Sequence, residues 1–199
     1  MKGKMTEECK LCGSDTKRID HPTIAYRSCP NCEFVFKEDK YLVSKDEELE
    51  IYNTHNNSIE DPRCLEFFYK FLNAAVFPYA SAGKEGLDFG SGSSPVLAEI
   101  LETNHNYKMH IYDLFYFPEK SYKGKKYDLI TSTEVVEHLK NPMEYFKLFT
   151  TLLKPQGILA VMTLFHQNDQ EHFQDWFYIR DPSHISFFTR NTMEYIAKE

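Results

Sequence analysis

Hydrophobic positions recur with two different spacings after residue 60. Asp61 and Pro62 form an N-cap and first-turn proline signature, and apolar residues then follow at helical spacing as far as Pro78. From Gly86 onward, short apolar runs alternate with helical segments. The predicted strands are 86–89, 110–112, 127–131 and 158–163, and the predicted helices begin near Pro95, Asn141 and Thr189. Strands that alternate with helices predict an α/β fold with a doubly wound, mostly parallel sheet.

A different pattern precedes this region. Four of the five cysteines lie within the first 32 residues, and residues 37–50 are dominated by charge. Within that charged segment, Ser44 and Glu47 are placed as a capping box for a short helix toward Tyr52. We therefore predict a small cysteine module at 1–40, a linker with a short helix at 41–60, and a larger domain at 61–199.

Composition limits the classes of protein that fit. At 199 residues the chain has room for one full domain and a small attachment, and 42% apolar with 27% charged residues is ordinary globular usage. A formal net charge of −7 weighs against nucleic acid as partner, because such binding depends on Lys and Arg neutralising phosphates. The charged start lacks the apolar run of a signal peptide, and no stretch nears the ~20 apolar residues of a membrane span. We expect a cytoplasmic protein with no membrane partner.

A glycine-rich turn follows the first predicted strand, with the sequence Asp88-Phe89-Gly90-Ser91-Gly92-Ser93-Ser94-Pro95. Glycines in a strand-to-helix turn let the backbone approach a ligand closely. Asp113 ends the next strand, where a carboxylate can accept hydrogen bonds from ribose hydroxyls. Pro95 occupies the third glycine position of the dinucleotide fingerprint, and Asp88 would repel a pyrophosphate but suits a ligand with an ammonium and a sulfonium group. A tight turn without a ligand is the alternative.

These residues resemble the first motif of class I S-adenosylmethionine-dependent methyltransferases, and Asp113 resembles their second-strand acid. Residues 127–130 are similar to the fourth strand of that family, 133–142 to the segment after it, and 153–158 to the turn into the fifth strand. The resemblance covers about residues 61 to 199. It implies S-adenosylmethionine as cofactor, with its methionine half at Asp88, Gly90 and Gly92, its ribose at Asp113, its other side along Thr133 and Glu134, and further contacts from Phe89, Ser91 and Leu114.

The chain departs from the family pattern in two places. Only 13 residues separate Asp113 from Tyr127, too few for the helix and strand that family members usually carry there, so the acid that contacts adenine is not identifiable. The sequence also stops at Glu199, within the helix predicted from Thr189 and before the expected closing antiparallel strands. Either the sequence is truncated or one sheet edge is uncovered, which proteins normally avoid.

The four N-terminal cysteines are Cys9, Cys12, Cys29 and Cys32, with the spacing C-x2-C-x16-C-x2-C. This spacing predicts a tetrahedral zinc site, and four thiolates leave no position for water, so we expect a structural ion with no catalytic part. Disulfides are the alternative, although nothing indicates export from the reducing cytosol. The module resembles the small zinc ribbons that precede some methyltransferase domains.

Candidates for the reaction itself are less specific. A sulfonium is already an excellent leaving group, so the protein mainly aligns the acceptor and excludes water. His138 and His184 are candidate catalytic residues, with His138 as a general base or, alternatively, a hydrogen-bond partner of the helix that follows. The aromatic stretch 165–188 predicts a lid over the acceptor pocket, with Trp176, Tyr178 and His184 as acceptor contacts and aromatic packing as the alternative. His55 and Asn56 could close the site from the other side.

The sequence thus predicts a methyltransferase that acts on a small-molecule acceptor. An RNA methyltransferase is a second hypothesis, disfavoured by the acidic balance and by the lack of an arginine-rich stripe. A binding module that keeps the fold without turnover is a third.

Overall fold

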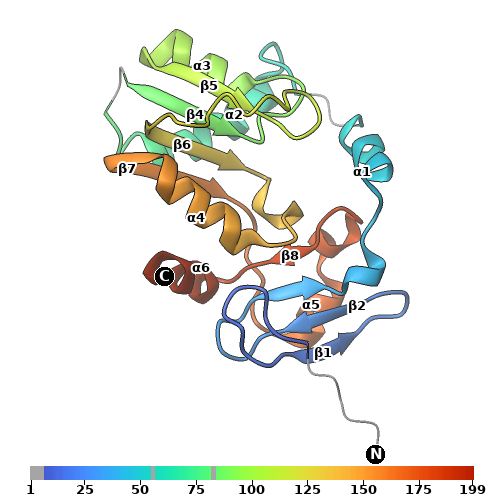
Figure 1. The fold of residues 1–199 in the computed structure, drawn as a ribbon. Helices are drawn as coiled ribbons and strands as arrows, with labels where there is room; N and C mark the ends of the chain where they lie inside the picture. The colour runs from blue at the N-terminus through green and yellow to red at the C-terminus, as the bar shows by residue number, and fades with distance from the viewer. Residues whose placement is uncertain (1–6, 55–56, 82–83) are drawn as a thin grey trace, which may run out of the picture. The chain divides into compact units, whose positions relative to one another are not determined.

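The computed structural model describes residues 7–54, 57–81 and 84–199 (Figure 1). Its contacts divide the chain into two compact units. The cysteine unit comprises Met1–Ile51, Val136–Phe146 and Thr163–Glu199, and the sheet unit comprises Tyr52–Val135 and Lys147–Met162. The predicted domain at 61–199 and this grouping cut the chain differently, because the last 37 residues pack with the N-terminal module.

The sheet unit is built on four parallel strands in the order β5-β4-β6-β7. Their bounds are β4 (Glu85–Phe89), β5 (Lys108–Tyr112), β6 (Tyr127–Thr133) and β7 (Leu153–Met162). The predicted parallel α/β fold is confirmed. Between Tyr112 and Tyr127 the structure has only the isolated bridge of Asp113 with Phe117, which agrees with the short spacing there.

One strand begins earlier than the sequence predicts. Residues 153–158 resemble a turn that leads into the strand predicted at 158–163, whereas β7 already pairs with β6 at Leu153. The register shifts there: Tyr127 pairs with Leu153 and Leu129 with Ile158, so four residues face one. Gln156, with φ +66°, lies in this irregularity. The predicted turn is therefore a bulge inside a longer strand.

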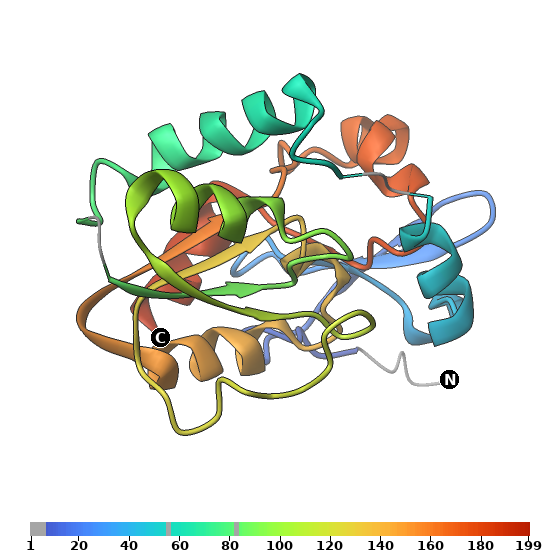
Figure 2. The same cartoon turned by 90° about the horizontal axis from the view of Figure 1, so that it is seen from above.

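Helices cover both faces of the sheet (Figure 2). On one face, α2 (Pro62–Phe71), the π-helical turn η2 (Leu72–Val76) and α3 (Val96–His105) form a core with apolar residues of the strands. On the other face, Phe149 of α4 (Pro142–Leu152) packs edge-on against Phe89, with ring centroids 4.9 Å apart. As predicted, Asp61 caps α2, accepting a hydrogen bond of 2.9 Å from the N–H of Arg63.

The cysteine unit has an antiparallel sheet in the order β1-β2-β3-β8. The strands are β1 (Lys17–Asp20), β2 (Ala25–Ser28), β3 (Val35–Lys37) and β8 (Ser186–Phe187). The unit also contains η1 (Asp39–Tyr41), η3 (Val136–His138), α5 (Gln170–Asp175), η4 (Phe177–Arg180) and α6 (Arg190–Lys198). A C-terminal strand thus completes the sheet of the N-terminal module.

Two predicted helix starts are confirmed by their caps. Helix α1 (Lys45–Tyr52) begins after Ser44, whose N–H and hydroxyl both donate to Oε2 of Glu47 at 2.8 Å. Helix α6 begins after Thr189, which exchanges hydrogen bonds with Thr192 in a capping box. Within the described ranges, none of the helices has the length and apolar character that crossing a membrane requires.

Candidate functional site

The glycine turn lies at the carboxyl end of β4 and is tied to the end of β5. The N–H groups of Gly90 and Ser91 donate to the carbonyl oxygen of Tyr112 at 2.7 and 3.1 Å, and the N–H of Gly92 donates to Oδ2 of Asp113 at 3.0 Å. Three successive donors of the turn are therefore engaged within the protein. A turn that binds a pyrophosphate offers such N–H groups to the ligand instead.

Asp113 is fixed at this edge by three backbone groups. Besides the bond from Gly92 to Oδ2, Oδ1 accepts hydrogen bonds from the N–H groups of Phe115 and Tyr116 at 2.9 and 3.1 Å. A carboxylate accepts about four hydrogen bonds, so these contacts use three positions and leave capacity on Oδ2. The carboxylate is thus held rigidly and keeps an acceptor position for a ligand hydroxyl, and its contact with the ribose remains a prediction.

Asp88 lies beneath the turn and is buried, with 2% of its surface exposed. Burial, opposed by a hydrogen bond of 2.9 Å from the Thr131 hydroxyl and assisted by the charge of Asp113, raises the pKa of Asp88 to about 7. A cation bound nearby would favour the charged carboxylate. Sequence reasoning missed Thr131, and its signal is register alone: it pairs with Asp88 across β4 and β6.

Gly90 is required for packing as well as for its backbone conformation. Its φ is +86°, and a Cβ there would overlap Cγ2 of Val135. We expect Gly90→Ala to lower the free energy of unfolding by about 2–4 kcal/mol through both effects. Gly124, with φ +76° and open space around its Cβ position, is the matched control, and Gly124→Ala should lose only the backbone part. Urea titrations measure both losses. Equal losses of stability in Gly90→Ala and Gly124→Ala would contradict the packing argument. It would also be contradicted if adding Val135→Ala did not restore part of the stability lost in Gly90→Ala.

The other predicted cofactor residues lie at or just after the carboxyl ends of β4, β5 and β6, and their side chains differ in exposure. The ring of Phe89 is buried in the core, so only its backbone can face a ligand. Leu114 is half exposed, Thr133 ends β6, and Glu134 follows with φ +52° and its N–H bonded to the carbonyl of Met162. Ser91 is buried within the turn. These roles remain predictions.

The predicted catalytic and acceptor residues come together inside the cysteine unit. The ring centroids of His138 and His184 are 4.8 Å apart, those of His184 and Tyr178 4.1 Å, and those of Tyr178 and Trp176 4.9 Å. Trp176 also belongs to an apolar core that includes Phe173 and, from β8, Phe187. This favours the packing alternative for Trp176. The lid role of this segment stays a prediction, and His55 and Asn56 lie outside the described residues.

The four cysteine sulfurs form one cluster, with all Sγ atoms within 4.8 Å of one another. The Sγ atoms of Cys9 and Cys32 are 3.6 Å apart and those of Cys12 and Cys29 are 3.4 Å apart, well beyond a disulfide bond of about 2.05 Å. Zinc–sulfur bonds of about 2.3 Å in a tetrahedron place sulfurs about 3.7 Å apart, so the cluster fits this ion. A hydrogen bond with Cys32 lowers the pKa of Cys9 to about 5, whereas burial raises that of Cys29 to about 11.

Both cysteine pairs are held by the same type of turn. In the first, the N–H of Cys9 donates to the carbonyl of Ser14 at 2.8 Å, and the N–H of Gly13 donates to the carbonyl of Cys9 at 2.9 Å. Cys29 and Glu33 occupy the equivalent places in the second, and Gly13 and Glu33 both have left-handed backbones, at φ +71° and +61°. Two matching turns therefore present two sulfurs each toward one point.

Comparison with known protein families decides the assignment of the larger region. A family model described as a methyltransferase domain matches residues 63–199, more than half of the 199-residue chain. The chain belongs to this methyltransferase family. The matched region contains every predicted cofactor residue, and the four cysteines lie outside it. A search of curated proteins finds no match.

Several solved structures share a distant likeness with this methyltransferase-family chain. BH2331, a candidate methyltransferase from Bacillus halodurans C-125, is 14% identical with a TM-score of 0.49, and 66% of each chain is covered. Coclaurine N-methyltransferase, bound to N-methylheliamine and SAH, is 16% identical with a TM-score of 0.49, covering 66% of this chain and 47% of the other. Phosphoethanolamine N-methyltransferase 2 of Haemonchus contortus, in complex with S-adenosyl-L-methionine, is 16% identical with a TM-score of 0.48. The match covers 92% of this chain and 54% of the other. The present chain thus spans less than two thirds of each of these proteins, and the family assignment rests on the family model alone.

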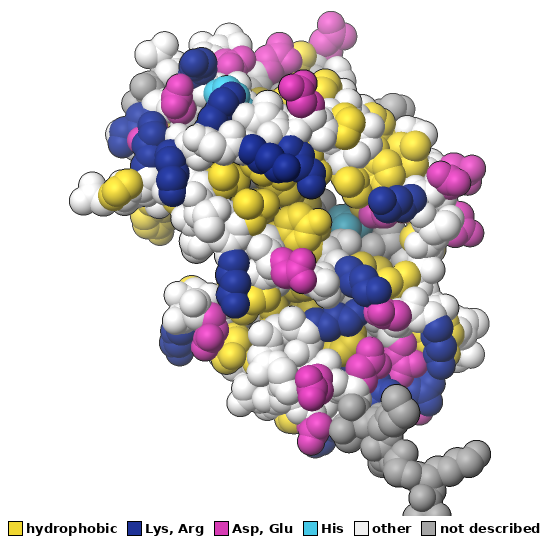
Figure 3. All heavy atoms as spheres, viewed as in Figure 1, with side chains coloured by type: hydrophobic (Ala, Val, Ile, Leu, Met, Phe, Trp, Pro, Cys, Tyr) yellow, Lys and Arg dark blue, Asp and Glu magenta, His cyan; other side chains and the backbone are white. Residues whose placement is uncertain are grey.

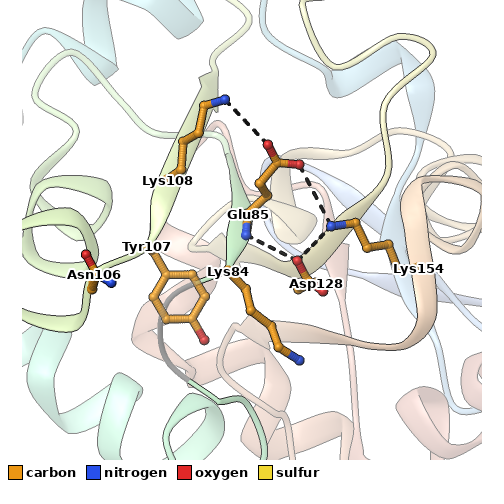
Figure 4. Close-up of a pocket in the computed structure, with 7 residues that line it drawn as sticks. All are labelled: Lys84, Glu85, Asn106, Tyr107, Lys108, Asp128 and Lys154. Carbon is orange, nitrogen blue, oxygen red and sulfur yellow. Dashed lines mark hydrogen bonds and ion pairs between the residues drawn. The ribbon is translucent and has the colours of Figure 1, made fainter.

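A pocket opens at the opposite edge of the methyltransferase sheet, at the amino ends of its strands (Figure 4). Its lining residues are Lys84, Glu85, Asn106, Tyr107, Lys108, Asp128 and Lys154. Oδ2 of Asp128 receives hydrogen bonds from Nζ of Lys154 at 2.8 Å and from the N–H of Glu85 at 3.1 Å. Ligands of open α/β sheets bind at the carboxyl ends of the strands, so we assign this pocket a structural ion-pair network.

Proposed function

We propose that this chain is an S-adenosylmethionine-dependent methyltransferase acting on a small-molecule acceptor. The observation that carries the proposal is the pairing of Asp113, clamped by the glycine turn, with the buried Asp88 below it. A rigid carboxylate suits a ribose hydroxyl, and a second, easily ionised carboxylate suits a cationic ligand. The turn's engaged N–H groups argue against a pyrophosphate-containing cofactor.

The residues of the sheet edge would divide the binding task. Asp113 would accept a hydrogen bond from the ribose through Oδ2, and Asp88 would ionise as the positive charge of the methionine half approaches. The glycines at φ +86° and +69° let the chain bend close to that half. When bound, the cofactor supplies a methyl group on a sulfonium, which needs alignment with the acceptor and exclusion of water rather than activation of the leaving group.

Charge favours a small acceptor over RNA. The chain carries a formal net charge of −7, and on the face shown in Figure 3 basic and acidic side chains are interspersed. A polyanion gains most of its affinity from clustered Lys and Arg. A binding module without catalytic activity would share the same cofactor site, so only a measurement of turnover distinguishes it from the proposed enzyme.

For the cysteine cluster we propose one structural zinc ion. The support is the sulfur spacing and the two matching turns, which offer four donors and no position for water. Zinc would let all four sulfurs bind as thiolates, although burial and mutual hydrogen bonding keep part of them protonated without it.

Turnover tests the proposed activity. The full chain is incubated with S-adenosylmethionine and with fractionated small metabolites or with total RNA, and S-adenosylhomocysteine is quantified. We expect product above the acceptor-free background with a metabolite fraction only, and Asp113→Ala as the control without activity. Product formed with RNA would show that the acceptor is RNA and not a small molecule. Cofactor binding without product from either the metabolite fractions or RNA would favour the binding module.

Replacing Asp88 should separate folding stability from cofactor binding. Its folded pKa of about 7 exceeds the unfolded value of about 3.9, so its contribution to stability is full below about pH 4 and is lost as pH rises through about 7. At pH 8, Asp88→Asn should therefore be more stable than the parent by an amount on the order of 2 kcal/mol, yet bind the cationic cofactor more weakly.

Urea unfolding at pH 5 and pH 8, with calorimetric titration at both, measures the two effects of Asp88→Asn. In the parent, affinity should increase from pH 5 to pH 8, and the variant should lack this increase. A variant that is less stable at pH 8 and binds as tightly as the parent would show that Asp88 has neither role.

A further inference from the structure

The cysteine unit holds a second group of potential metal ligands. Glu137, His138 and His184 each offer one donor atom, and these atoms lie within 4.8 Å of one another. We call them the Glu137 cluster. Glu137 has no exposed surface, His184 is 8% exposed and His138 is half-buried. Such a group in the interior requires partners that hold its orientation.

Backbone carbonyls fix the tautomer of both histidines. Nδ1 of His138 lies 3.1 Å from the carbonyl oxygen of Ser183, and Nδ1 of His184 lies 2.8 Å from that of Tyr178. A carbonyl only accepts, so each Nδ1 carries a hydrogen and each neutral ring has its lone pair on Nε2. Metal-binding histidines characteristically donate their other N–H in this way.

Tyr178 orients the carboxylate of the same cluster. Its hydroxyl donates to Oε1 of Glu137 at 2.6 Å, while its carbonyl receives the N–H of His184. The carbonyl of Glu137 in turn accepts the N–H of Ile185 at 2.8 Å, which ties η3 to the segment before β8. One tyrosine therefore supports two of the three donor residues from the outer sphere, as second-sphere groups of metal sites do.

The charge around the cluster favours a cation. Oδ2 of Asp181 lies 3.8 Å from Nε2 of His184, which adds a second carboxylate beside Glu137. Lys37 is a nearby charge of the opposite sign: it is buried, its Nζ donates to the carbonyl of Pro182 at 2.7 Å, and it interacts electrostatically with Asp181. The carboxylate of Asp181 thus lies between this ammonium group and the imidazole of His184.

We propose that Glu137, His138 and His184 bind one divalent transition-metal ion. Two imidazoles and one carboxylate form a known three-ligand set for such ions and leave positions open for water or substrate oxygen. Bonds of about 2.1 Å place two ligands about 3–4 Å apart, so donors within 4.8 Å of one another would close by at most about 1–2 Å. Site occupancy does not require the proposed methyltransferase activity.

A consequence for the acceptor does rest on the proposed function. The open positions would take an acceptor with one or two hydroxyl oxygens, because a metal ion binds such oxygens and lowers their pKa. The ligand class inferred for the open positions is therefore a hydroxylated small molecule.

Manganese titration of the zinc-loaded full chain tests the site. One equivalent of Zn²⁺ per chain first fills the four thiolates, the softer ligand set, and free Mn²⁺ is then counted by electron paramagnetic resonance. We expect one Mn²⁺ per chain, with affinity reduced at least ~10-fold in Glu137→Gln and in His184→Gln. His172→Gln, which changes an exposed histidine of α5, is the matched control and should bind as the parent does. Absence of binding, or equal affinity in all variants, would overturn the proposal.

A second measurement uses the unsubstituted protein, so it tests the site even if the variants fail to fold. In ¹⁵N spectra of the histidine rings, we expect the Nδ1-protonated tautomer for His138 and His184, and substoichiometric Mn²⁺ should broaden these two rings before the other histidines. Uniform broadening would overturn the site. Calorimetry with S-adenosylhomocysteine on the same manganese-free sample separates the two proposals: cofactor binding without a manganese site contradicts only the metal, and the reverse contradicts only the proposed activity.

Discussion

Chelation of zinc is expected to unfold residues 7–40 of the chain. Structural zinc sites contribute about 10–16 kcal/mol of apparent binding free energy, comparable with the whole stability of a domain at about 5–15 kcal/mol. The three strands of the module have only three or four residues each, and Cys9, Cys29 and Cys32 are themselves buried in it. Without the ion, buried thiols and thiolates would face one another at 3.4–3.6 Å.

The effect should spread from the module to the C-terminal helix. Glu33 of the second cysteine turn accepts hydrogen bonds of 2.8 Å from Thr189 and from Asn191, and the carbonyl of Cys32 accepts one of 2.9 Å from Thr192. These residues form the start of α6, so loss of the turn removes the partners of its cap. We therefore expect cleavage near both ends of the chain.

Limited proteolysis with mass spectrometry, before and after chelation, measures this loss, and added zinc should reverse it. Cys9→Ser should mimic chelation and lower the zinc content. Cys64→Ser, which changes the cysteine outside the cluster, should keep both zinc and protease resistance. An N-terminal module that stays equally resistant without metal would show that the site is not structural.

Asp113→Ala should lower the affinity for S-adenosylhomocysteine about 100-fold. The change removes a charged acceptor for the ribose, typically about 1.5–3 kcal/mol, and also the oxygen that holds the N–H of Gly92 in the turn. Asp113→Asn keeps one acceptor oxygen and should show an intermediate loss. Calorimetric titration gives all three affinities, and urea unfolding shows how much of the effect is loss of stability.

A matched carboxylate of the same sheet controls for this substitution. Asp128 lies at the amino end of β6, bonded to Lys154 and to the backbone of β4, at the edge opposite the glycine turn. Asp128→Asn should alter stability modestly and leave cofactor affinity unchanged. If Asp113→Ala binds the cofactor as tightly as the parent, Asp113 does not hold the ribose.

Local signals account for what the sequence predicted well. The helix starts at Asp61 and Thr189 depend on side chains within three residues of the bonds they make, and the parallel strands were visible as apolar runs between helices. The short segment between Asp113 and Tyr127 was likewise readable from length alone. The bulge in β7 was missed because Pro155 and Gly157 are equally typical of a turn.

Long-range pairing accounts for what the sequence did not show. Strand β8 has two residues and pairs with β3, so Phe187 faces Val35 across 152 positions of the chain, and no periodic pattern marks so short a strand. For the same reason the sequence did not show that part of the aromatic stretch 165–188 packs with β1, β2 and β3, and its role as a lid stays a prediction. In the Glu137 cluster, His138 and His184 are 46 positions apart in the chain. The sequence predicted both as separate catalytic candidates and gave no sign of Glu137 as their partner.

The most direct test of the proposed cofactor is calorimetric titration of the full, zinc-loaded chain with S-adenosylhomocysteine, with NAD as the comparison ligand. We expect one binding site per chain for S-adenosylhomocysteine and no heat of binding with NAD. A parallel titration with the cationic S-adenosylmethionine should give tighter binding at pH 8 than at pH 5. Binding of NAD, or no binding of either adenosyl compound to the folded protein, would contradict the proposed cofactor.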